Sequence, residues 1–474
     1  MQDPAEALLE PEERVLSTLS KDGSRRWLKP KLSRGRYLQW RRLVAYLLII
    51  TYTALPFVKV GGHPLFLFDI PAREFTVFGY VFLPTDTLLL ALLLVEGLLA
   101  LFLLTALLGR IWCGWACPQT VYMEFVFRPL ERLFEGTTGR GGTPRKPPAS
   151  WRKAARFAVY LLVSFALANT FLAYFVGVDA LAEWMTRSPI THPVSFSVMA
   201  VLTIAMMVHF SYFREQLCII ACPYGRLQSV LLDEGSRVVT YDASRGEPRG
   251  KKSKSLPVLR GDCVDCRLCV ETCPTGIDIR DGLQMECVNC TQCMDACDRV
   301  MNKLGRKPGL VGYGYQANAE GKTRGPSRFR VTLYPVVMAV VAGLFVAALL
   351  AKQPFDAVLL RNQGQPFTFA ADGRVRNVLR LKLTERADTP QRFHLQLDEG
   401  TETTIEFQHD PLEVGPREQQ SFPVSVLAAP ELFVAAQGRV PLRVRVVEHG
   451  GAELEVEATL LGPATLRRPQ TGER

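Results

Sequence analysis

Two stretches, CVDCRLCVETCP at residues 263–274 and CVNCTQCMDACD at residues 287–298, decide how this chain is organised. Each holds four cysteines in the spacing C-x2-C-x2-C-x3-C, by which thiolates bind pairs of cubane iron–sulfur clusters. In such pairs the fourth ligand of each cluster comes from the other motif. We therefore predict two [4Fe-4S] clusters, one on Cys263, Cys266, Cys269 and Cys297 and the other on Cys287, Cys290, Cys293 and Cys273.

Paired zinc sites are the alternative, because zinc also binds C-x2-C groups. Zinc needs only four ligands, however, and does not explain an x2-x2-x3 periodicity that occurs twice. One departure from the usual pattern concerns the residue after the fourth cysteine, which is Pro274 in the first motif and Asp298 in the second. We expect this change to affect the local turn and not the ligation.

The remaining four cysteines form a second, duplicated motif. CGWACP begins at Cys113 and CIIACP at Cys218, 105 residues later, and each follows a pair of apolar segments. In a helix two cysteines four residues apart share one face, and the following proline stops or kinks the helix. The duplication predicts that Cys113, Cys117, Cys218 and Cys222 meet between two similar halves.

The chemistry of this second motif is open at this point. Four thiols form a soft site that favours Cu(I) over Cu(II). They could equally work as a dithiol–disulfide pair that takes electrons from the clusters. Inert thiols buried at helix ends are the third alternative.

Five segments are apolar over about the 20 residues that a membrane span requires. They are residues 41–58, 87–108, 157–178, 194–213 and 331–351. Lys and Arg concentrate in alternate connecting segments, with nine in 21–42, nine in 109–156 and nineteen in 213–330, against three in 59–86 and 179–193 together. The positive-inside rule then places the N-terminus and all twelve cysteines in the cytoplasm and the C-terminal tail in the periplasm.

The tail is expected to be a β domain. Stretches such as RVRNVLRLKLTE and VPLRVRVVEH alternate apolar and polar residues, and Gly, Pro and Asp punctuate them, which is typical of a β-sandwich. Between the membrane segments, QTVYMEFVFRPLERLFEG at residues 119–136 has apolar residues at helical spacing and predicts an amphipathic helix at the membrane surface.

The predicted fold class is an α-helical polytopic membrane protein with an inserted two-cluster ferredoxin domain (α+β) and a C-terminal immunoglobulin-like β-sandwich. The predicted domains are a basic cytoplasmic segment (1–40), a four-helix membrane domain (41–234), the ferredoxin-like domain (235–330), a fifth transmembrane helix (331–351) and the β domain (352–474). The first forty residues are polar, so we expect no cleaved signal peptide. The net charge of +10 is explained by the membrane-flanking basic segments, and we expect no nucleic-acid binding.

Three residues within the spans are weaker candidates. Glu96 is an acid in the middle of an apolar segment, where a proton or quinol role competes with a neutral helix contact. Met206 and His209 lie in MMVHF and could assist a soft metal, although packing is the commoner role of such a methionine.

GRIWCGWACPQTVYMEFVFRPLERLFEG, CIIACPYGRLQSV, the paired cluster motifs and the β tail together resemble the CcoG family, also called FixG or RdxA. The resemblance extends from about Arg36 onward. It implies a cytochrome oxidase accessory protein of the bacterial inner membrane that reduces Cu(II) to Cu(I) for assembly of a cbb-type oxidase. It also implies that copper, the substrate ion, meets Cys113, Cys117, Cys218 and Cys222.

The expected partners are the lipid bilayer, cbb-type oxidase assembly factors, a copper chaperone or importer, and an electron donor that the sequence does not name; a homodimer is left open. Two alternatives remain. The first is an electron-transfer subunit of a NapH-like quinol dehydrogenase, which shares the thiol repeats and ferredoxin motifs but lacks the fifth span and the β tail. The second is a redox-sensing or scaffolding assembly factor.

Overall fold

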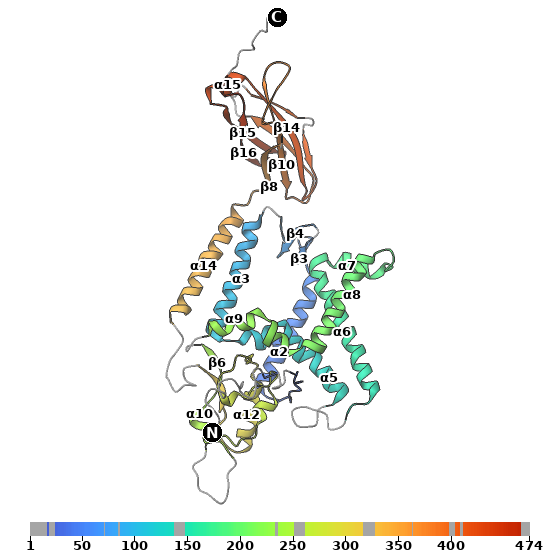
Figure 1. Cartoon of the computed structure of the whole chain (residues 1–474), viewed down its shortest axis with the longest axis vertical. Helices are drawn as coiled ribbons and strands as arrows, with labels where there is room; N and C mark the ends of the chain where they lie inside the picture. Colours follow the sequence, from blue (N-terminus) through green and yellow to red (C-terminus); the bar gives the residue numbers. More distant parts are fainter. Residues whose placement is uncertain are drawn as a thin grey trace, which may run out of the picture. The chain divides into compact units, whose positions relative to one another are not determined.

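The computed structural model describes residues 17–18, 24–70, 72–83, 86–136, 147–232, 236–250, 261–315, 328–362, 364–397, 403–407 and 411–465. The chain forms two compact units, Met1–Val346 and Ala347–Arg474. The first unit holds all twelve cysteines, and the second holds the β domain (Figure 1).

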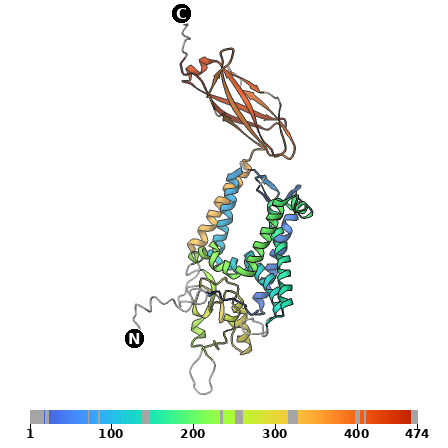
Figure 2. The ribbon, with the colours of Figure 1, turned by 45° about the vertical axis from the view of Figure 1, so that its right-hand side comes forward.

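Four helices in the described part of the chain are long and apolar enough to cross a membrane. They are α3 (Thr87–Leu108), α6 (Ser150–Val176), α8 (Pro193–Val208) with its π-helical extension η6 (His209–Phe213), and α14 (Arg328–Leu350). Helices α6 and α8 pack side by side in both views of the ribbon (Figures 1 and 2), and the short helix α7 (Val178–Thr186) lies between them in sequence. Four of the five expected spans thus have the length and composition that a bilayer requires.

The first expected span, residues 41–58, is not among these four. Helix α2 covers Arg36–Ala54 and is followed by a single 3-10 turn, η1 (Leu55–Phe57). The basic residues in its first two turns reduce its hydropathy, and Arg41 among them is buried with 1% of its surface exposed. In the N-terminal half of α2 one face, with Leu38, Arg41 and Ala45, therefore lies against protein, while Trp40 and Leu43 are exposed.

Helix α2 nevertheless runs from the cluster-binding part of the unit to the C-terminal end of α6. At its start the backbone N–H groups of Tyr37 and Leu38 donate to the carboxylate of Asp295, in the cluster-binding part of the unit. Near its end the Tyr52 ring stacks on Tyr174, close to the end of α6. A 19-residue α-helix is about 28 Å long, close to the thickness of the hydrocarbon core.

The predicted internal repeat is confirmed by the backbone. Each copy of the motif follows a membrane helix that ends at a residue with positive φ, Gly109 (φ 60°, ψ −134°) or Arg214 (φ 50°, ψ −124°). Each then forms a single π-helical turn, η3 (Trp112–Ala116) or η7 (Leu217–Ala221). Equivalent residues 105 positions apart thus have the same local conformation.

The prediction that both cysteines of each motif share one helix face is wrong. Cys113 and Cys218 lie in the π turns, but Cys117 and Cys222 are extended residues that precede the next helix. The cause is the proline that follows, because proline disfavours the α conformation in the residue before it. The prolines then occupy the first turns of α4 (Pro118–Tyr122) and α9 (Pro223–Leu231), as is common for this residue.

The helix predicted after Pro118 is present and continues from α4 through a π turn, η4 (Met123–Phe127), into α5 (Arg128–Glu135). Most of its apolar residues are buried or half-buried against α2, α6 and α8, and Arg128 and Glu131 are buried as well, whereas Leu133 is exposed. The segment is thus covered over most of its length and exposed near its C-terminal end. Its position at a membrane surface stays a prediction.

A small β structure between α2 and α3 was not predicted. It consists of a two-stranded ladder, β1 (Lys59–Val60) and β2 (His63–Pro64), and a three-stranded antiparallel sheet. The three strands are β3 (Phe66–Asp69), β4 (Glu74–Val77) and β5 (Tyr80–Phe82). Strand β3 packs on α6, so this sheet covers the end of that helix.

The cluster motifs lie in a compact set of short elements. Two strands, β6 (Arg237–Tyr241) and β7 (Val311–Tyr315), pair antiparallel and enclose the segment that carries both motifs. Between them are α10 (Ala243–Gly246), α11 (Leu268–Glu271), η8 (Ile279–Asp281) and α12 (Gln292–Lys303). A buried core that includes Val239, Met294 and Leu310 holds the two strands against α12.

The second unit is a β-sandwich, as predicted. One sheet has the order β12-β14-β10-β8 with β9 paired to β10, and the other has the order β13-β11-β15-β16. The strands are β8 (Phe355–Arg361), β9 (Thr368–Phe369), β10 (Val375–Glu385), β11 (Gln391–Leu397), β12 (Thr403–Phe407), β13 (Leu412–Val414), β14 (Gln419–Ala428), β15 (Arg439–Glu448) and β16 (Glu453–Leu461), with a short helix α15 (Pro430–Ala435) before β15. Alternate residues of β10 and β15 fill a core between the sheets, where the rings of Phe355 and Phe393 meet edge to face.

Candidate functional site

Both C-x2-C-x2-C motifs fold in the same way. In the first motif Asp265 and Arg267, on either side of the second cysteine, have positive φ angles of 53° and 56°. In the second motif the equivalent Asn289 and Thr291 have φ angles of 53° and 62°. Left-handed residues alternating with right-handed ones direct successive backbone N–H groups to one side, an arrangement found at anionic iron–sulfur sites.

The structure brings the predicted ligand sets together across the two motifs. One cavity is lined by Cys273 and Cys269 from the first motif and by Cys287, Cys290 and Cys293 from the second. In the other set, Cys297 lies near enough to Cys266 and Cys263 for their thiolate charges to raise its pKa, although burial contributes more. Each fourth cysteine thus lies with the three cysteines of the opposite motif.

The chemistry of these thiols fits an iron–sulfur cluster. Among the described residues, neither these thiols nor those of the duplicated motif converge tightly enough in this structure to hold a single ion directly. Thiols spread around one cavity suit the wider cubane. Burial raises the pKa of Cys287 to about 11 and that of Cys290 to about 12, and Cys273 raises both further. Buried thiols of this kind become thiolates when a metal replaces their protons.

In the second motif Asp298 stands where a proline usually follows the fourth cysteine, and this difference changes the local structure. Helix α11 ends at Glu271, two residues before Cys273, and the chain turns away at Pro274. Helix α12 instead continues through Cys297 and Asp298 to Lys303, and the Asp298 carboxylate accepts a hydrogen bond from the Gly309 backbone N–H at 2.7 Å. The departure lengthens the helix and closes the loop that leads to β7.

The four thiols of the duplicated motif also come together. Burial raises the pKa of Cys218 to about 12, and the nearby thiolates of Cys117, Cys113 and Cys222 raise it further. Burial likewise raises the pKa of Cys113 to about 12, with Cys117 as the next contributor. All four are free thiols, partly buried and within electrostatic range of one another. The predicted meeting of the two halves is therefore present.

The first thiol motif packs directly on the loop of one cluster motif. A Cβ atom at Gly114, between Cys113 and Cys117, would lie 2.5 Å from the carbonyl oxygen of Val288 and 2.7 Å from that of Asn289. These two residues lie between Cys287 and Cys290. Backbone touches backbone here because residue 114 has no side chain.

Two buried arginines reinforce this contact. The Arg41 guanidinium donates through Nε to the Gly114 carbonyl oxygen at 3.0 Å, and its charge lowers the pKa that burial gives Cys290. The Arg110 guanidinium donates to the carbonyl oxygen of Cys287 at 3.0 Å and lies near Cys113. Positive charge thus lies between the two groups of thiols.

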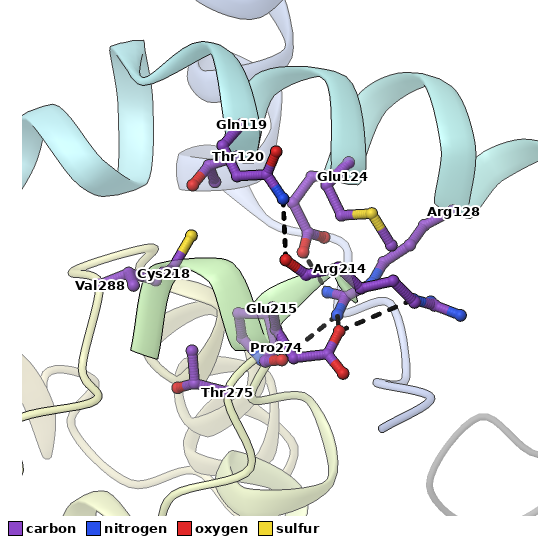
Figure 3. A pocket seen from close by; sticks show the side chains of 11 residues that line it. Gln119, Thr120, Glu124, Arg128, Arg214, Glu215, Cys218, Pro274, Thr275 and Val288 are labelled. Carbon is purple, nitrogen blue, oxygen red and sulfur yellow. Dashed lines mark hydrogen bonds and ion pairs between the residues drawn. The ribbon is translucent and has the colours of Figure 1, made fainter. Parts of the chain in front are cut away.

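A buried ion network holds the second thiol motif to the same region (Figure 3). Arg214 forms two hydrogen bonds with Glu131, at 2.8 and 3.3 Å, and Arg128 reaches both Glu215 at 3.3 Å and the carbonyl oxygen of Pro274 at 3.2 Å. Burial would raise the pKa of Glu131, but Arg214 and the neighbouring cations hold it below its usual value. The network joins the start of the second motif to α5 and to the residue after Cys273.

The weaker candidates lie elsewhere. His209 Nε2 hydrogen-bonds Gln119 Oε1, and Met206 packs in the apolar cluster around Phe127. Both line an apolar cavity between helices, and neither lies among the thiols. Glu96 lies on α3 with its Oε2 atom buried and without a hydrogen-bond partner among the described residues.

Sequence reasoning missed the polar residues that hold the site together: Arg41, Arg110, Gln119, Arg128, Arg214 and Glu215. A signal was present, because Arg110 and Glu215 occupy equivalent places in the two repeats, three residues before the first cysteine. Charges at equivalent positions of a repeat, beside apolar helices, are candidates for buried pairing.

Family models match three parts of the chain: a 4Fe-4S dicluster domain at residues 213–316, a 4Fe-4S binding domain at residues 90–136, and the Ig-like fold at the C-terminus of FixG at residues 345–463. Protein RdxA of Cereibacter sphaeroides is 36% identical over 348 residues, which cover 70% of this chain and 72% of RdxA. Nitrogen fixation protein FixG of Rhizobium meliloti is 35% identical over 420 residues, covering 79% of each chain.

The chain belongs to the FixG and RdxA family. Protein RdxB of Cereibacter sphaeroides is similar as well, with 32% identity over 81% of this chain and 84% of RdxB. The resemblance inferred from the cysteine motifs is confirmed. Like its family, the chain is an iron–sulfur protein with a role in electron transfer at a membrane.

We expect this member of the FixG and RdxA family to contain about eight iron and eight labile sulfide ions per chain, because eight thiols surround two sites. The measurement is metal and sulfide analysis of protein purified without oxygen. Replacing Cys290 by Ser should remove about half of the iron, since it disrupts one ligand set and leaves the other intact. Stoichiometric zinc in place of iron would contradict the assignment.

Proposed function

We propose that this chain is an inner-membrane oxidoreductase that reduces Cu(II) to Cu(I) at Cys113, Cys117, Cys218 and Cys222. The observation that carries the proposal is the contact of Gly114 with Val288 and Asn289. It brings the thiol motif against the backbone between two predicted cluster ligands. A donor and an acceptor in direct contact can exchange an electron without another carrier.

The thiols suit this reaction. When bound, the two clusters supply single electrons, and each Cu(II) ion needs one. Thiolates are soft ligands that stabilise Cu(I) more than Cu(II), so binding at the four thiols makes reduction more favourable. The Gln228 side chain accepts a hydrogen bond from Cys113 Sγ at 3.4 Å and keeps this thiol oriented until copper displaces its proton.

The choice of copper as the substrate, and the role of the Cu(I) that is formed, rest on the resemblance to the CcoG family. On that basis Cu(I) passes to a chaperone or importer on the cytoplasmic side and serves the assembly of a cbb-type oxidase. The β domain carries no cysteine, so we assign it a docking or stabilising role in the periplasm.

The test uses the purified full-length protein, reduced with dithionite and freed of excess reductant. Addition of Cu(II) together with a colour-forming Cu(I) chelator should yield about two Cu(I) ions per chain, because each of two clusters gives one electron. The same protein without dithionite is the control, because it keeps the same thiols; it should yield about two Cu(I) fewer per chain, one for each electron that the clusters lack. Clusters that stay reduced in the presence of Cu(II) would refute the proposal.

The proposed topology can be tested separately. Helix α2 reaches from Asp295 to Tyr174, so we count it as a crossing, which gives five with the four apolar helices. A reporter that is active only in the periplasm should then work when fused after Arg474 and fail when inserted near Gly250. Activity at both positions would remove α14 from the set of crossings, because it is the one proposed crossing that lies between them.

A further inference from the structure

A cavity of about 610 Å³ lies between α2, α6, α8 and the start of α4. Its walls are aromatic and aliphatic, and include Tyr52, Tyr122, Phe171 and Tyr174. Two of its lining residues, Phe171 of α6 and Ala205 of α8, are exposed and lie in predicted spans, so the cavity has an open side toward lipid. Its volume and lining are those of a site for a small apolar molecule.

One end of the cavity is polar. His209 Nε2 donates to Gln119 Oε1, and Gln119 donates through Nε2 to the carbonyl oxygen of Arg214 at 2.8 Å. With Nε2 protonated, Nδ1 is the nitrogen of His209 that can accept a proton. Tyr122, a residue with 7% of its surface exposed, lines the same cavity, and its hydroxyl lies near the Thr53 side chain.

This cavity is also the first of three neighbouring cavities that share lining residues. Gln119 lines both this cavity and the pocket of Figure 3, which also holds Cys218. Thr275 and Val288 in turn line both the Figure 3 pocket and the cavity ringed by Cys273, Cys287, Cys290 and Cys293. The apolar cavity is thus separated from a predicted cluster site by single layers of side chains.

We propose that this cavity binds a membrane quinol and that the quinol is the electron donor of the protein. The proposal names the donor for the proposed copper reduction and rests on that function for the final acceptor only. Oxidation of the quinol to the quinone releases two electrons and two protons. Clusters bound at the two cysteine sets would accept one electron each; one proton goes to His209, and the other goes to water.

A phospholipid acyl chain is the competing occupant, because it would fill the same apolar walls. It offers no hydrogen-bond partner to His209 Nδ1, however, since an acyl chain has no polar group at its buried end. A quinol head has a flat ring for the aromatic walls and two opposed oxygens for the polar end. Its isoprenoid tail leaves through the open side toward lipid.

The test measures quinone binding and quinol-driven cluster reduction in full-length protein in lipid nanodiscs, with decylubiquinol as the probe. His209→Phe keeps the ring that packs on Phe210 and removes both nitrogens; Gln119→Leu removes the amide, and Ala205→Trp fills the cavity. We expect each variant to weaken quinone binding and slow bleaching of the cluster absorbance by about tenfold or more. His192→Phe, at an exposed position beside the other end of α8, is the matched control and should behave as wild type.

Iron content and copper reduction after dithionite should stay normal in His209→Phe, Ala205→Trp and His192→Phe, which shows that these variants fold. Unchanged quinone affinity in the three cavity variants would overturn the inference, as would wild-type clusters that dithionite reduces and quinol does not. Co-purified phospholipid that excess quinone fails to displace would identify the occupant as lipid. Failure of copper reduction with dithionite as well as quinol would instead count against the proposed function and leave quinol binding standing.

Discussion

Replacing Cys113, Cys117, Cys218 and Cys222 by Ala is expected to abolish Cu(II) reduction while iron and sulfide stay near eight per chain. The four thiols are the soft ligands that favour Cu(I), and they lie outside the two sets that surround the cluster sites. Their loss should remove the copper site and leave the clusters able to accept electrons. The measurement is Cu(I) formed by dithionite-reduced protein, with iron analysis on the same sample.

The contrast with cluster ligands makes this result specific. Cys266→Ala or Cys290→Ala should lower iron content and copper reduction together, because these residues belong to the ligand sets. In the quadruple variant only copper reduction should fall. Reduction at the wild-type rate in the quadruple variant would make these thiols structural and the clusters themselves the direct reductant.

An intermediate outcome would separate the remaining alternatives. A dithiol that forms a disulfide needs two cysteines, so a variant that keeps only Cys113 and Cys117 would retain that chemistry. A copper site built from the thiols of both repeats would instead be lost in this variant, because Cys218 and Cys222 are missing from the group of four thiols that lie together. Burial raises the pKa of Cys113 and Cys218 to about 12, which disfavours the thiolate that disulfide exchange needs.

The gathering of the cysteines in the two cluster motifs and the β-sandwich were predictable because their signals are local. Cysteine spacing determines which thiols can reach one cluster, and the alternation in RVRNVLRLKLTE already marks the buried face of β10. The grouping of Cys273 with Cys287, Cys290 and Cys293 followed from the two-motif rule. The duplicated cysteines were also predicted to meet, since a repeat implies two similar halves.

The rest of the site depends on contacts between distant segments. Arg128 bonds the carbonyl oxygen of a residue 146 positions away, and no local pattern marks that pairing. The π turns and extended cysteines follow from Pro118 and Pro223, but sequence spacing alone suggested an ordinary helix. Helix α2 was assigned by composition, whereas its buried Arg41 is explained by its bond to Gly114 and its place over the Phe125 ring.

The second large effect is expected from a single methyl group at Gly114. In Gly114→Ala the new Cβ would lie 2.5 and 2.7 Å from two backbone oxygens, distances that real Cβ atoms do not tolerate. Neither oxygen can move without shifting the Cys287–Cys290 loop or the Cys113–Cys117 turn. Overpacking usually costs about 1–3 kcal/mol, and fixed backbone neighbours place this case at or above the upper end.

The matched control is Gly97→Ala, on the helix that leads to the same motif. A methyl group at Gly97 would have no neighbouring atom within 4 Å, so alanine there should be tolerated and should gain about 1 kcal/mol of helix propensity.

We expect Gly114→Ala to lower copper reduction by about tenfold or more, since a displacement of about 1 Å at a reacting pair is enough for such a loss. Gly97→Ala should stay within about twofold of wild type, in line with a small effect at an open surface site. The decisive comparison in Gly114→Ala is between the change in iron content and the change in copper reduction. If iron stays near eight while copper reduction falls, the contact serves electron transfer between the cluster loop and the thiols. If iron falls in parallel, the contact holds the cluster loop in place, and the route to copper would have to be sought through Cys218 and the pocket that it shares with Thr275 and Val288.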